Sequence, residues 1–456
     1  MKQFHRAFHL KTIISLTLAW LLIILGIYLR ANKADVFPAD NNDDSLFYTW
    51  AGITFWDNPL QLATHSIFEA NNPALIWRSQ YKDFIPWERF GMKIVKPWLD
   101  HPPLGTAIIG LPAKLLGYQA FQQIPQLIVR FSALAASILT MLFTYILGKK
   151  LFGEKIGQLS LLFLATIPYF VAAHRQSFLE NILTPLFLAS LIALLKNKLV
   201  LAGILAFFCG WIKVPGFSVL FMIALWLWRN KQTKPSLIFF LTGIASILSF
   251  IGYGFLAGKD AFLYILNQQS TRGAFVNSFF DTLTHPHFYG GFDDGLYVLS
   301  IIFSILMLTK FKNNNFKFFN FFLSMWLVVL FLVAGRGNNS PWYWYPLIPF
   351  FSIGIGYYAN LLLKNNNFFL ILPFWLFGLT GFDLLKIDLP SNWLRLATIL
   401  FFLPYVLNLK RASFWLTRIF IVCLILFNIY VTIRYPFVYC RDEKCPKPVK
   451  ISLNHE

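Results

Sequence analysis

The sequence predicts an all-α polytopic membrane protein with about thirteen transmembrane helices and a large first outer loop that carries interfacial helices. Of its 456 residues, 57% are hydrophobic and only 13% are charged, whereas a soluble domain carries about 25% charged residues. Apolar runs long enough to cross a bilayer recur along the chain and dominate over amphipathic periods. The composition therefore excludes a soluble enzyme and a disordered or fibrous chain.

The first apolar run, 12–28, follows Lys2, Arg6 and Lys11, so the N-terminus is expected in the cytoplasm. A cleaved signal peptide is the alternative, but the apolar core is long for one, and no small-residue cleavage site stands out. The next long run, 127–147, comes much later. The intervening loop, 31–125, is therefore expected outside, and within it the short apolar stretch 104–116 is predicted to be an interfacial helix.

Further spans are predicted at roughly 156–173, 180–195, 199–214, 216–228, 235–256, 296–309, 318–334, 345–363, 367–382, 393–409 and 414–433. The turns that this topology places in the cytoplasm, together with the N-terminus, hold about 18 Lys and Arg residues and one acidic residue, Glu154. Such an asymmetry is typical of cytoplasmic loops. It also accounts for the net charge of +19 without nucleic acid, which is not expected as a partner.

The chain divides into two expected modules. Residues 1–256 form a catalytic transmembrane module that includes the outer loop 31–125, and residues 257–456 form a C-terminal transmembrane module. The second module has an outer loop at 257–295 and an exported tail at 435–456. Cys440 and Cys445 lie in that tail, on the oxidising side, where a small-loop disulfide is plausible.

Acidic residues that directly follow the first predicted span are candidates for a functional role. Asp43 and Asp44 close an acidic cluster that begins at Asp40 and precedes an aromatic helical stretch. Adjacent carboxylates beside apolar rings acquire a raised proton affinity, which suits a general base. The alternative is a solvated helix cap, since Asp commonly precedes a helix start.

A second cluster, Asp100-His101-Pro102-Pro103, opens the predicted interfacial helix. Proline at the first helical position is a start signal, so one interpretation is that Asp100 or His101 caps that helix. The functional alternative is that one of them faces a phosphate or a metal ion.

Further candidates lie at the outer ends of later spans. Arg175 suits a phosphate clamp, and Glu180 follows it five residues later; an outer-rim salt bridge or a headgroup contact is the alternative. Lys213 ends a span, where snorkelling to the interface would also explain it. Arg336 precedes the aromatic stretch 341–346, which an interfacial aromatic belt would explain without a ligand.

The outer loop 257–295 holds a second set of candidate metal ligands: Asp281, His285, His287, Asp293 and Asp294. The His-Pro-His spacing supplies only two ligands and does not match a zinc signature. Cations and carboxylates thus converge on one predicted face, where a lipid-borne phosphate could meet the cations.

Three motifs in this order resemble those of membrane-embedded glycosyltransferases that use polyprenyl-phosphate sugars. This group includes dolichyl-phosphate-mannose protein mannosyltransferases and bacterial aminoarabinose transferases of lipid A. The resemblance covers roughly 10–350, most securely 40–195. It rests on the acidic pair in 43–51, on Asp-His-Pro-Pro-Leu in 100–105, and on Arg175 followed by Glu180, where the family more often has Asp.

The resemblance implies a GT-C-like fold and a role for each motif. Asp43 would be the catalytic base, assisted by Asp44. The donor phosphate and substrate would be bound by Asp100, His101, Arg175, Glu180, Lys213 and Arg336. Some relatives also bind a divalent metal, so the resemblance leaves a metal ion open.

The expected activity is inverting transfer of a hexosyl or pentosyl group from a polyprenyl-phosphate-linked sugar donor to an acceptor hydroxyl. Polyprenyl phosphate is a stable leaving anion, so cations and one carboxylate base suffice. The expected location is the plasma membrane, with the active site on its extracytoplasmic face. Neither the sugar nor the acceptor, be it a glycan, lipid or protein, follows from the sequence. A lipid or solute transporter or flippase is the main alternative, and a non-catalytic assembly protein is a third.

Overall fold

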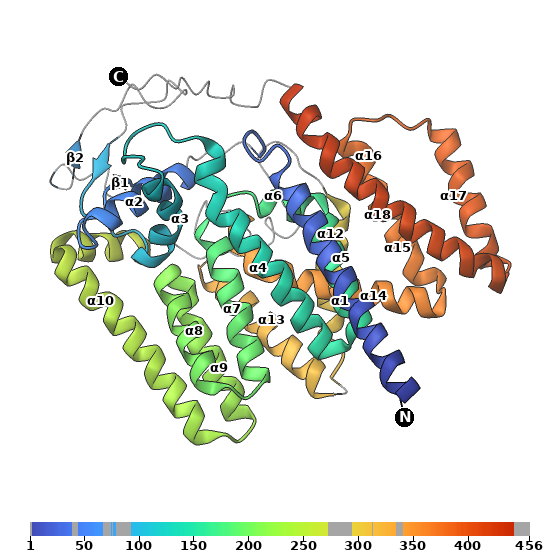
Figure 1. Cartoon of the computed structure of the whole chain (residues 1–456), viewed down its shortest axis with the longest axis horizontal. Coiled ribbons are helices and arrows are strands. Elements are labelled where there is room, and N and C mark those ends of the chain that lie inside the picture. The colour runs from blue at the N-terminus through green and yellow to red at the C-terminus, as the bar shows by residue number, and fades with distance from the viewer. Residues whose placement is uncertain are drawn as a thin grey trace.

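The computed structural model describes residues 2–38, 44–66, 74, 76–78, 93–271, 294–311, 313–333 and 341–441. Long helices lie side by side in a bundle, with the short helices α2 and α3 and three short strands gathered at one end (Figure 1). The chain begins near the opposite end. We call these the α2–α3 end and the N-terminal end.

Every predicted apolar run contains a helix, which confirms an all-α polytopic architecture. The helices are α1 Lys2–Ala31, α2 Asp44–Asp57, α3 Pro103–Leu115, α4 Gln126–Phe152, α5 Glu154–Thr166, α6 Pro168–Ala173, α7 Leu179–Leu195, α8 Leu199–Ile212, α9 Ser218–Arg229, α10 Thr233–Ser270, α12 Gly295–Met307, α13 Asn314–Val333, α14 Ile348–Asn365, α15 Phe368–Gly378, α16 Thr380–Leu384, α17 Ser391–Val406 and α18 Lys410–Arg441. Among the described residues, six helices are long and apolar enough to cross a membrane, and shorter apolar helices accompany them.

Some predicted spans are interrupted rather than continuous. The run 156–173 divides into α5 and α6 at Pro168, because proline has no N–H to continue the helical ladder. The run 345–363 begins as a 3-10 helix, Pro341–Leu347, and becomes α14 only afterwards.

Helices α2 and α3 cross closely at Gly52 and Gly110. A Cβ at Gly52 would lie 2.0 Å from the Thr106 carbonyl oxygen, and one at Gly110 would lie 2.5 Å from the Gly52 carbonyl carbon. Only glycine permits such an approach of the two backbones. The predicted interfacial helix 104–116 is thus confirmed as a helix, packed against a second one.

A small antiparallel sheet supports the same region. Its strands are β1 Thr64–His65, β2 Ile76–Arg78 and β3 Ile94–Val95, in the order β1-β3-β2, with Thr64 and Ile76 both opposite Val95. The sequence analysis did not predict these strands, because two or three residues are too few to show a period.

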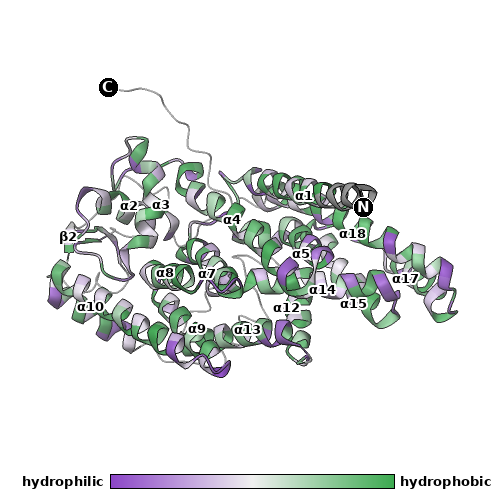
Figure 2. Cartoon of the chain, turned by 60° about the horizontal axis from the view of Figure 1, so that its bottom comes forward, coloured by the Kyte–Doolittle hydropathy of each residue, from purple (hydrophilic) through white to green (hydrophobic). Residues whose placement is uncertain are grey.

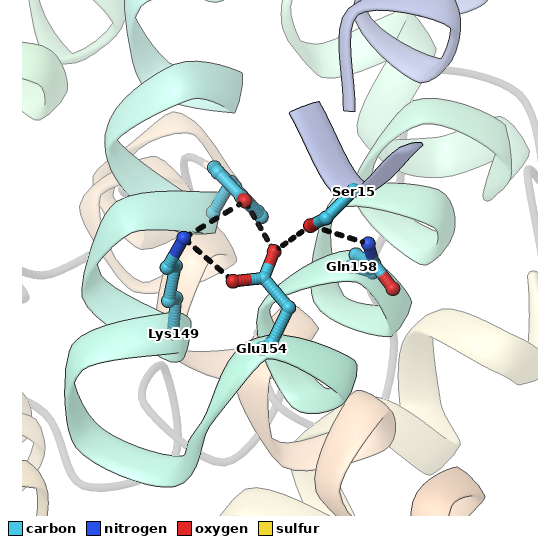
Figure 3. Close-up of polar contacts among 5 residues, drawn as sticks. Ser15, Lys149, Glu154 and Gln158 are labelled. Carbon is cyan, nitrogen blue, oxygen red and sulfur yellow. Dashed lines mark hydrogen bonds and ion pairs between the residues drawn. The ribbon is translucent and has the colours of Figure 1, made fainter. Parts of the chain in front are cut away.

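At the N-terminal end, a polar cluster joins α1 to the α4–α5 hairpin (Figure 3). Lys149 Nζ lies 2.6 Å from Glu154 Oε2, while Tyr145 and Ser15 donate their hydroxyl protons to Glu154 Oε1. Gln158 Nε2 donates to Ser15 Oγ at 3.0 Å. Glu154, the one acidic residue in the predicted cytoplasmic turns, is therefore fully engaged within the fold.

Candidate functional site

Most of the predicted site residues that the structure describes lie on or directly beside the helices α2, α3, α7 and α8. Asp44 begins α2, Asp100 and His101 immediately precede α3, Glu180 lies in the first turn of α7, and Lys213 follows α8. Asp43 and Arg336 lie outside the described residues. Contacts and charge interactions connect the first five of these residues, whereas Arg175 lies in a different cluster.

Glu180 and Lys213 form a buried ion pair. Each side chain is 3% exposed, and Lys213 Nζ donates to Glu180 Oε1. The snorkelling interpretation of Lys213 is therefore wrong, because its ammonium group turns into the protein rather than towards the membrane surface. The other oxygen, Glu180 Oε2, is buried and has no hydrogen-bond partner among the described residues.

Tyr343 completes the surroundings of this pair. Its ring centroid lies 4.4 Å from Lys213 Nζ, a cation–π contact. Sequence reasoning assigned Tyr343 to an interfacial aromatic belt, and that interpretation is wrong for this stretch. Trp342, Trp344 and Tyr345 are 7%, 3% and 0% exposed, and Tyr345 donates to Gln176 Oε1 at 3.0 Å. The rings pack inside the protein because the 3-10 helix turns them against α7 and its preceding loop.

Tyr48 stands at the centre of the acidic groups. Burial raises the pKa of its hydroxyl well above the usual value, and Asp44, Glu180, Tyr343 and Asp100 raise it further, in that order. The phenol therefore stays protonated and can donate a hydrogen bond. Sequence reasoning missed Tyr48, although its position four residues after Asp44 places both on one face of a helix.

Asp100 and His101 are held in different ways. Asp100 is 6% exposed, and Ser66 Oγ lies 2.9 and 2.8 Å from its two carboxylate oxygens. The His101 ring packs between Tyr48 and Trp98, with both centroids 5.8 Å away, and its Nε2 lies 3.4 Å from the Tyr48 hydroxyl. Helix α3 starts at Pro103 as predicted, but neither residue caps it: Pro102 is the N-cap and no side-chain cap bond forms.

Arg175 belongs to a separate polar cluster at the end of α1. Its guanidinium is 1% exposed and donates to the Leu29 and Arg30 carbonyl oxygens at 2.6 and 3.1 Å. These carbonyls belong to the last turn of α1, whose C-terminus favours positive charge. Arg175 and Glu180 therefore do not pair with each other, and the outer-rim salt bridge between them is not formed.

The side chains of Arg30, Arg130 and His174 complete this arginine cluster. His174 Nδ1 lies 3.0 Å from an Arg30 guanidinium nitrogen, and burial followed by the charge of Arg30 lowers the pKa of His174 well below its usual value. The imidazole is therefore neutral and accepts this bond. Arg130 donates to the Ala34 and Pro38 carbonyl oxygens, beyond α1. The cluster thus holds the chain that leads from α1 towards Asp43 and Asp44.

The candidate metal ligands of the loop 257–295 lie outside the described residues, except Asp294. Its carboxylate caps α12, accepting from the backbone N–H groups of Leu296 and Tyr297 at 3.0 and 3.3 Å and from Tyr169 N–H at 2.9 Å. Burial raises the pKa of Asp294 to about 6 in spite of these bonds. Among the described residues, no three His, Cys, Asp or Glu side chains cluster as metal ligands would.

Comparisons with known proteins bear on the family and on the fold. Residues 100–254 match the family model for dolichyl-phosphate-mannose-protein mannosyltransferase, a range that includes Asp100, His101, Arg175, Glu180 and Lys213. The structure is similar to that of ArnT from Cupriavidus metallidurans bound to undecaprenyl phosphate, with a TM-score of 0.56 and 12% identity over 93% of this chain and 77% of that one. The chain therefore has an ArnT-like GT-C fold.

The apo form of the same ArnT gives a TM-score of 0.55 at 12% identity, over 94% of this chain and 78% of that one. The archaeal oligosaccharyltransferase AglB from Archaeoglobus fulgidus is more distant, with a TM-score of 0.47 at 12% identity over 93% of this chain and 56% of that one. No curated protein sequence matches the chain significantly. The resemblance to this glycosyltransferase family is confirmed over 100–254, the range that holds the second and third motifs, and the ArnT-like fold extends over nearly the whole chain.

Proposed function

We propose that this GT-C protein transfers a sugar from a polyprenyl-phosphate carrier to an acceptor hydroxyl on the extracytoplasmic face of the plasma membrane, inverting the anomeric carbon. The observation that carries the proposal is the cluster at the α2–α3 end. There the buried ammonium group of Lys213 interacts electrostatically with the carboxylate of Asp44. The hydroxyl group of Tyr48 interacts in the same way with three carboxylates, those of Asp44, Asp100 and Glu180. A cation and carboxylates so close together suit an anionic leaving group and a hydroxyl nucleophile.

Lys213 is the group best suited to the donor phosphate. As the acceptor oxygen bonds to the anomeric carbon, the bond from that carbon to the phosphate oxygen breaks, and its electron pair leaves with polyprenyl phosphate. A fixed cation stabilises this anion most where water is excluded, and the 3% exposure of Lys213 meets that condition. The Tyr343 ring keeps the ammonium in place.

The acidic pair Asp43–Asp44 supplies the base. The acceptor hydroxyl loses its proton to one of these carboxylates during the attack, and direct displacement inverts the anomeric carbon. One base suffices because the carrier phosphate needs no protonation to leave. None of these roles requires a metal ion.

The placement on the outer face rests on charge. The turns at the N-terminal end hold nearly all of the basic excess, which is typical of the cytoplasmic side, so the α2–α3 end would face outwards. A lipid-linked donor also suits the absence of a nucleotide-binding domain from the described residues.

The test compares membranes that overexpress the wild type, Asp43→Asn, Asp44→Asn and, as a control, Asp57→Asn. Asp57 ends α2 with a side chain 58% exposed, paired with Lys114. Lipid mass spectrometry would follow the polyprenyl-phosphate-sugar pools, with extract of the native organism supplied as acceptor. We expect the wild type and Asp57→Asn to deplete one lipid-linked sugar. The two site variants should deplete it at least 100-fold more slowly, because general base catalysis contributes a rate factor of about 10²–10⁴.

That result would also name the sugar. Depletion at the wild-type rate by both Asp43→Asn and Asp44→Asn would reject the base assignment. Identical pools in all four membranes, even with the extract, would reject the donor class.

A further inference from the structure

A second polar pocket lies at the opposite end of the bundle from the candidate site. It has a volume of about 140 Å³ and lies between the end of α9 and the beginning of α13. Figure 2, in which this end comes forward, shows hydrophilic turns at the ends of these helices beside hydrophobic helix surface. The pocket can therefore contact both the polar and the apolar part of an amphipathic ligand.

Two cations from distant parts of the sequence line this pocket. Arg229 is the last residue of α9, and Lys317 lies in the first turn of α13. Both side chains are exposed, and in the described part of the chain neither makes an ion pair with a carboxylate. An anion between them would offset their repulsion, and a guanidinium fork beside an ammonium suits a phosphate group.

The pocket also contains a buried acceptor that the fold leaves unsatisfied. Asn320 is 4% exposed, and its Nδ2 donates to the Lys310 carbonyl oxygen at 2.9 Å, which fixes the amide. Asn320 Oδ1 is buried and has no hydrogen-bond partner in the described part of the chain, a costly arrangement for an amide oxygen. Ser324 lines the same pocket one helical turn further along α13. Together they suit a ligand that carries a hydroxyl donor beside its phosphate.

The remaining lining is apolar. Phe311 is 61% exposed, and Phe321 and Met325 are half-buried. Behind them, the Trp226 ring of α9 packs on Phe318 and Phe321 of α13 with centroids 5.1 and 5.4 Å away. Such a wall would be of no use to free phosphate, whereas it can contact the glycerol backbone and first methylene groups of a lipid.

We propose that this pocket binds the headgroup of an anionic phospholipid from the leaflet at the N-terminal end. Arg229 and Lys317 contact the phosphodiester, while Asn320 Oδ1 accepts from a headgroup hydroxyl with Ser324 beside it. The site lies at the other end of the bundle from the proposed transfer reaction and does not depend on it.

The test uses the full-length protein in detergent and native mass spectrometry. Phosphatidylglycerol is the probe; phosphatidylcholine and inorganic phosphate are the comparison ligands. We expect one tightly retained phosphatidylglycerol, with weaker phosphatidylcholine binding. The double variant Arg229→Ala/Lys317→Ala should weaken phosphatidylglycerol binding roughly tenfold or more, since each basic residue near a membrane surface contributes on the order of a fivefold affinity.

Two further variants make the test specific. Ser324→Phe fills the pocket without changing charge and should lose the retained lipid as well. Lys234→Ala/Lys364→Ala removes two exposed cations from other turns at the same end and should leave binding unchanged. An equal loss in this control would show a general attraction to basic loops and overturn the proposal. Inorganic phosphate that competes as well as the lipid would overturn it in favour of a soluble phosphate site.

Discussion

Two Glu–Lys pairs lie at opposite ends of the bundle and differ in burial and in hydrogen bonding. Near the candidate site, Glu180 and Lys213 are each 3% exposed, and Glu180 Oε2 has no partner in the described part of the chain. At the N-terminal end, the Lys149 and Glu154 side chains are 44% and 34% exposed. Tyr145, Ser15 and Lys149 together satisfy both oxygens of Glu154 (Figure 3).

This difference indicates that Lys149–Glu154 is a structural ion pair, whereas Lys213–Glu180 is available for chemistry. A partly exposed pair with complete hydrogen bonding holds α1 against the α4–α5 hairpin at little desolvation cost. Burying two charges and leaving one acceptor unsatisfied is costly, and such arrangements concentrate at functional sites. Both pairs join a lysine to a glutamate, so residue type does not distinguish them, whereas burial and completeness of hydrogen bonding do.

The largest expected effect follows from breaking the buried pair. Lys213→Met leaves Glu180 as an uncompensated buried carboxylate, which typically costs about 3–5 kcal/mol. We expect a clearly lower thermal unfolding midpoint in detergent and no sugar transfer. The double variant Lys213→Met/Glu180→Gln removes both charges and should recover most of the midpoint while transfer stays lost.

This double variant separates stability from function. Recovery of both the midpoint and transfer would show that Lys213 serves only to neutralise Glu180. In that case the donor phosphate must be bound by another cation.

An intermediate effect is expected at Arg175, between the two extremes. A lysine cannot reach both the Leu29 and Arg30 carbonyl oxygens, so Arg175→Lys should lose one charge-assisted bond, worth about 1.5–3 kcal/mol. As a positioning residue for the segment before Asp43, Arg175 should affect kcat while the KM for the lipid-linked donor stays unchanged. Steady-state kinetics on the purified protein would measure both, with the exposed Arg395→Lys as a control.

A donor KM that rises while kcat is preserved would instead support the role implied by the family resemblance, in which Arg175 contacts the donor. The hydrogen bonds of its guanidinium to the Leu29 and Arg30 carbonyl oxygens favour the positioning role.

The smallest effect is expected at the exposed pair. Burial acts to raise the pKa of Glu154, but hydrogen bonds from Lys149, Ser15 and Tyr145 outweigh it and lower the pKa. A lowered carboxyl pKa contributes stability above the unfolded-state value near 4.5, and this is lost as pH falls through the folded-state value. Glu154→Gln should therefore cost about 0–1 kcal/mol at neutral pH, with transfer unchanged.

Thermal midpoints of the wild type and Glu154→Gln, measured from pH 7 down to pH 3, would check this. The two curves should converge at the acidic end. A constant separation at every pH would mean that the charge of Glu154 contributes nothing.

Local sequence was enough for some of the site. Asp44, Asp100 and Lys213 could be selected because charged residues next to long apolar runs are costly unless they have a function. Tyr48 and Tyr343 were missed, since aromatic residues abound in this chain and nothing local marks two of them as neighbours of charges. Arg175 was selected for its charge. The sequence does not show whether its guanidinium binds a phosphate or the carbonyl oxygens at the end of α1, because that helix lies about 145 residues earlier in the chain.

The sequence by itself determined the helices, their approximate ends and the common end to which the site residues belong. Apolar length and charge asymmetry act locally, through the energetics of burying a backbone in lipid, and need no knowledge of neighbours. Only the tertiary structure decided which charges pair, which rings are buried and which carbonyls the arginines satisfy. Those outcomes depend on contacts between residues far apart in the chain. In the protein interior, burial strengthens electrostatic interactions and makes each unsatisfied polar atom costly.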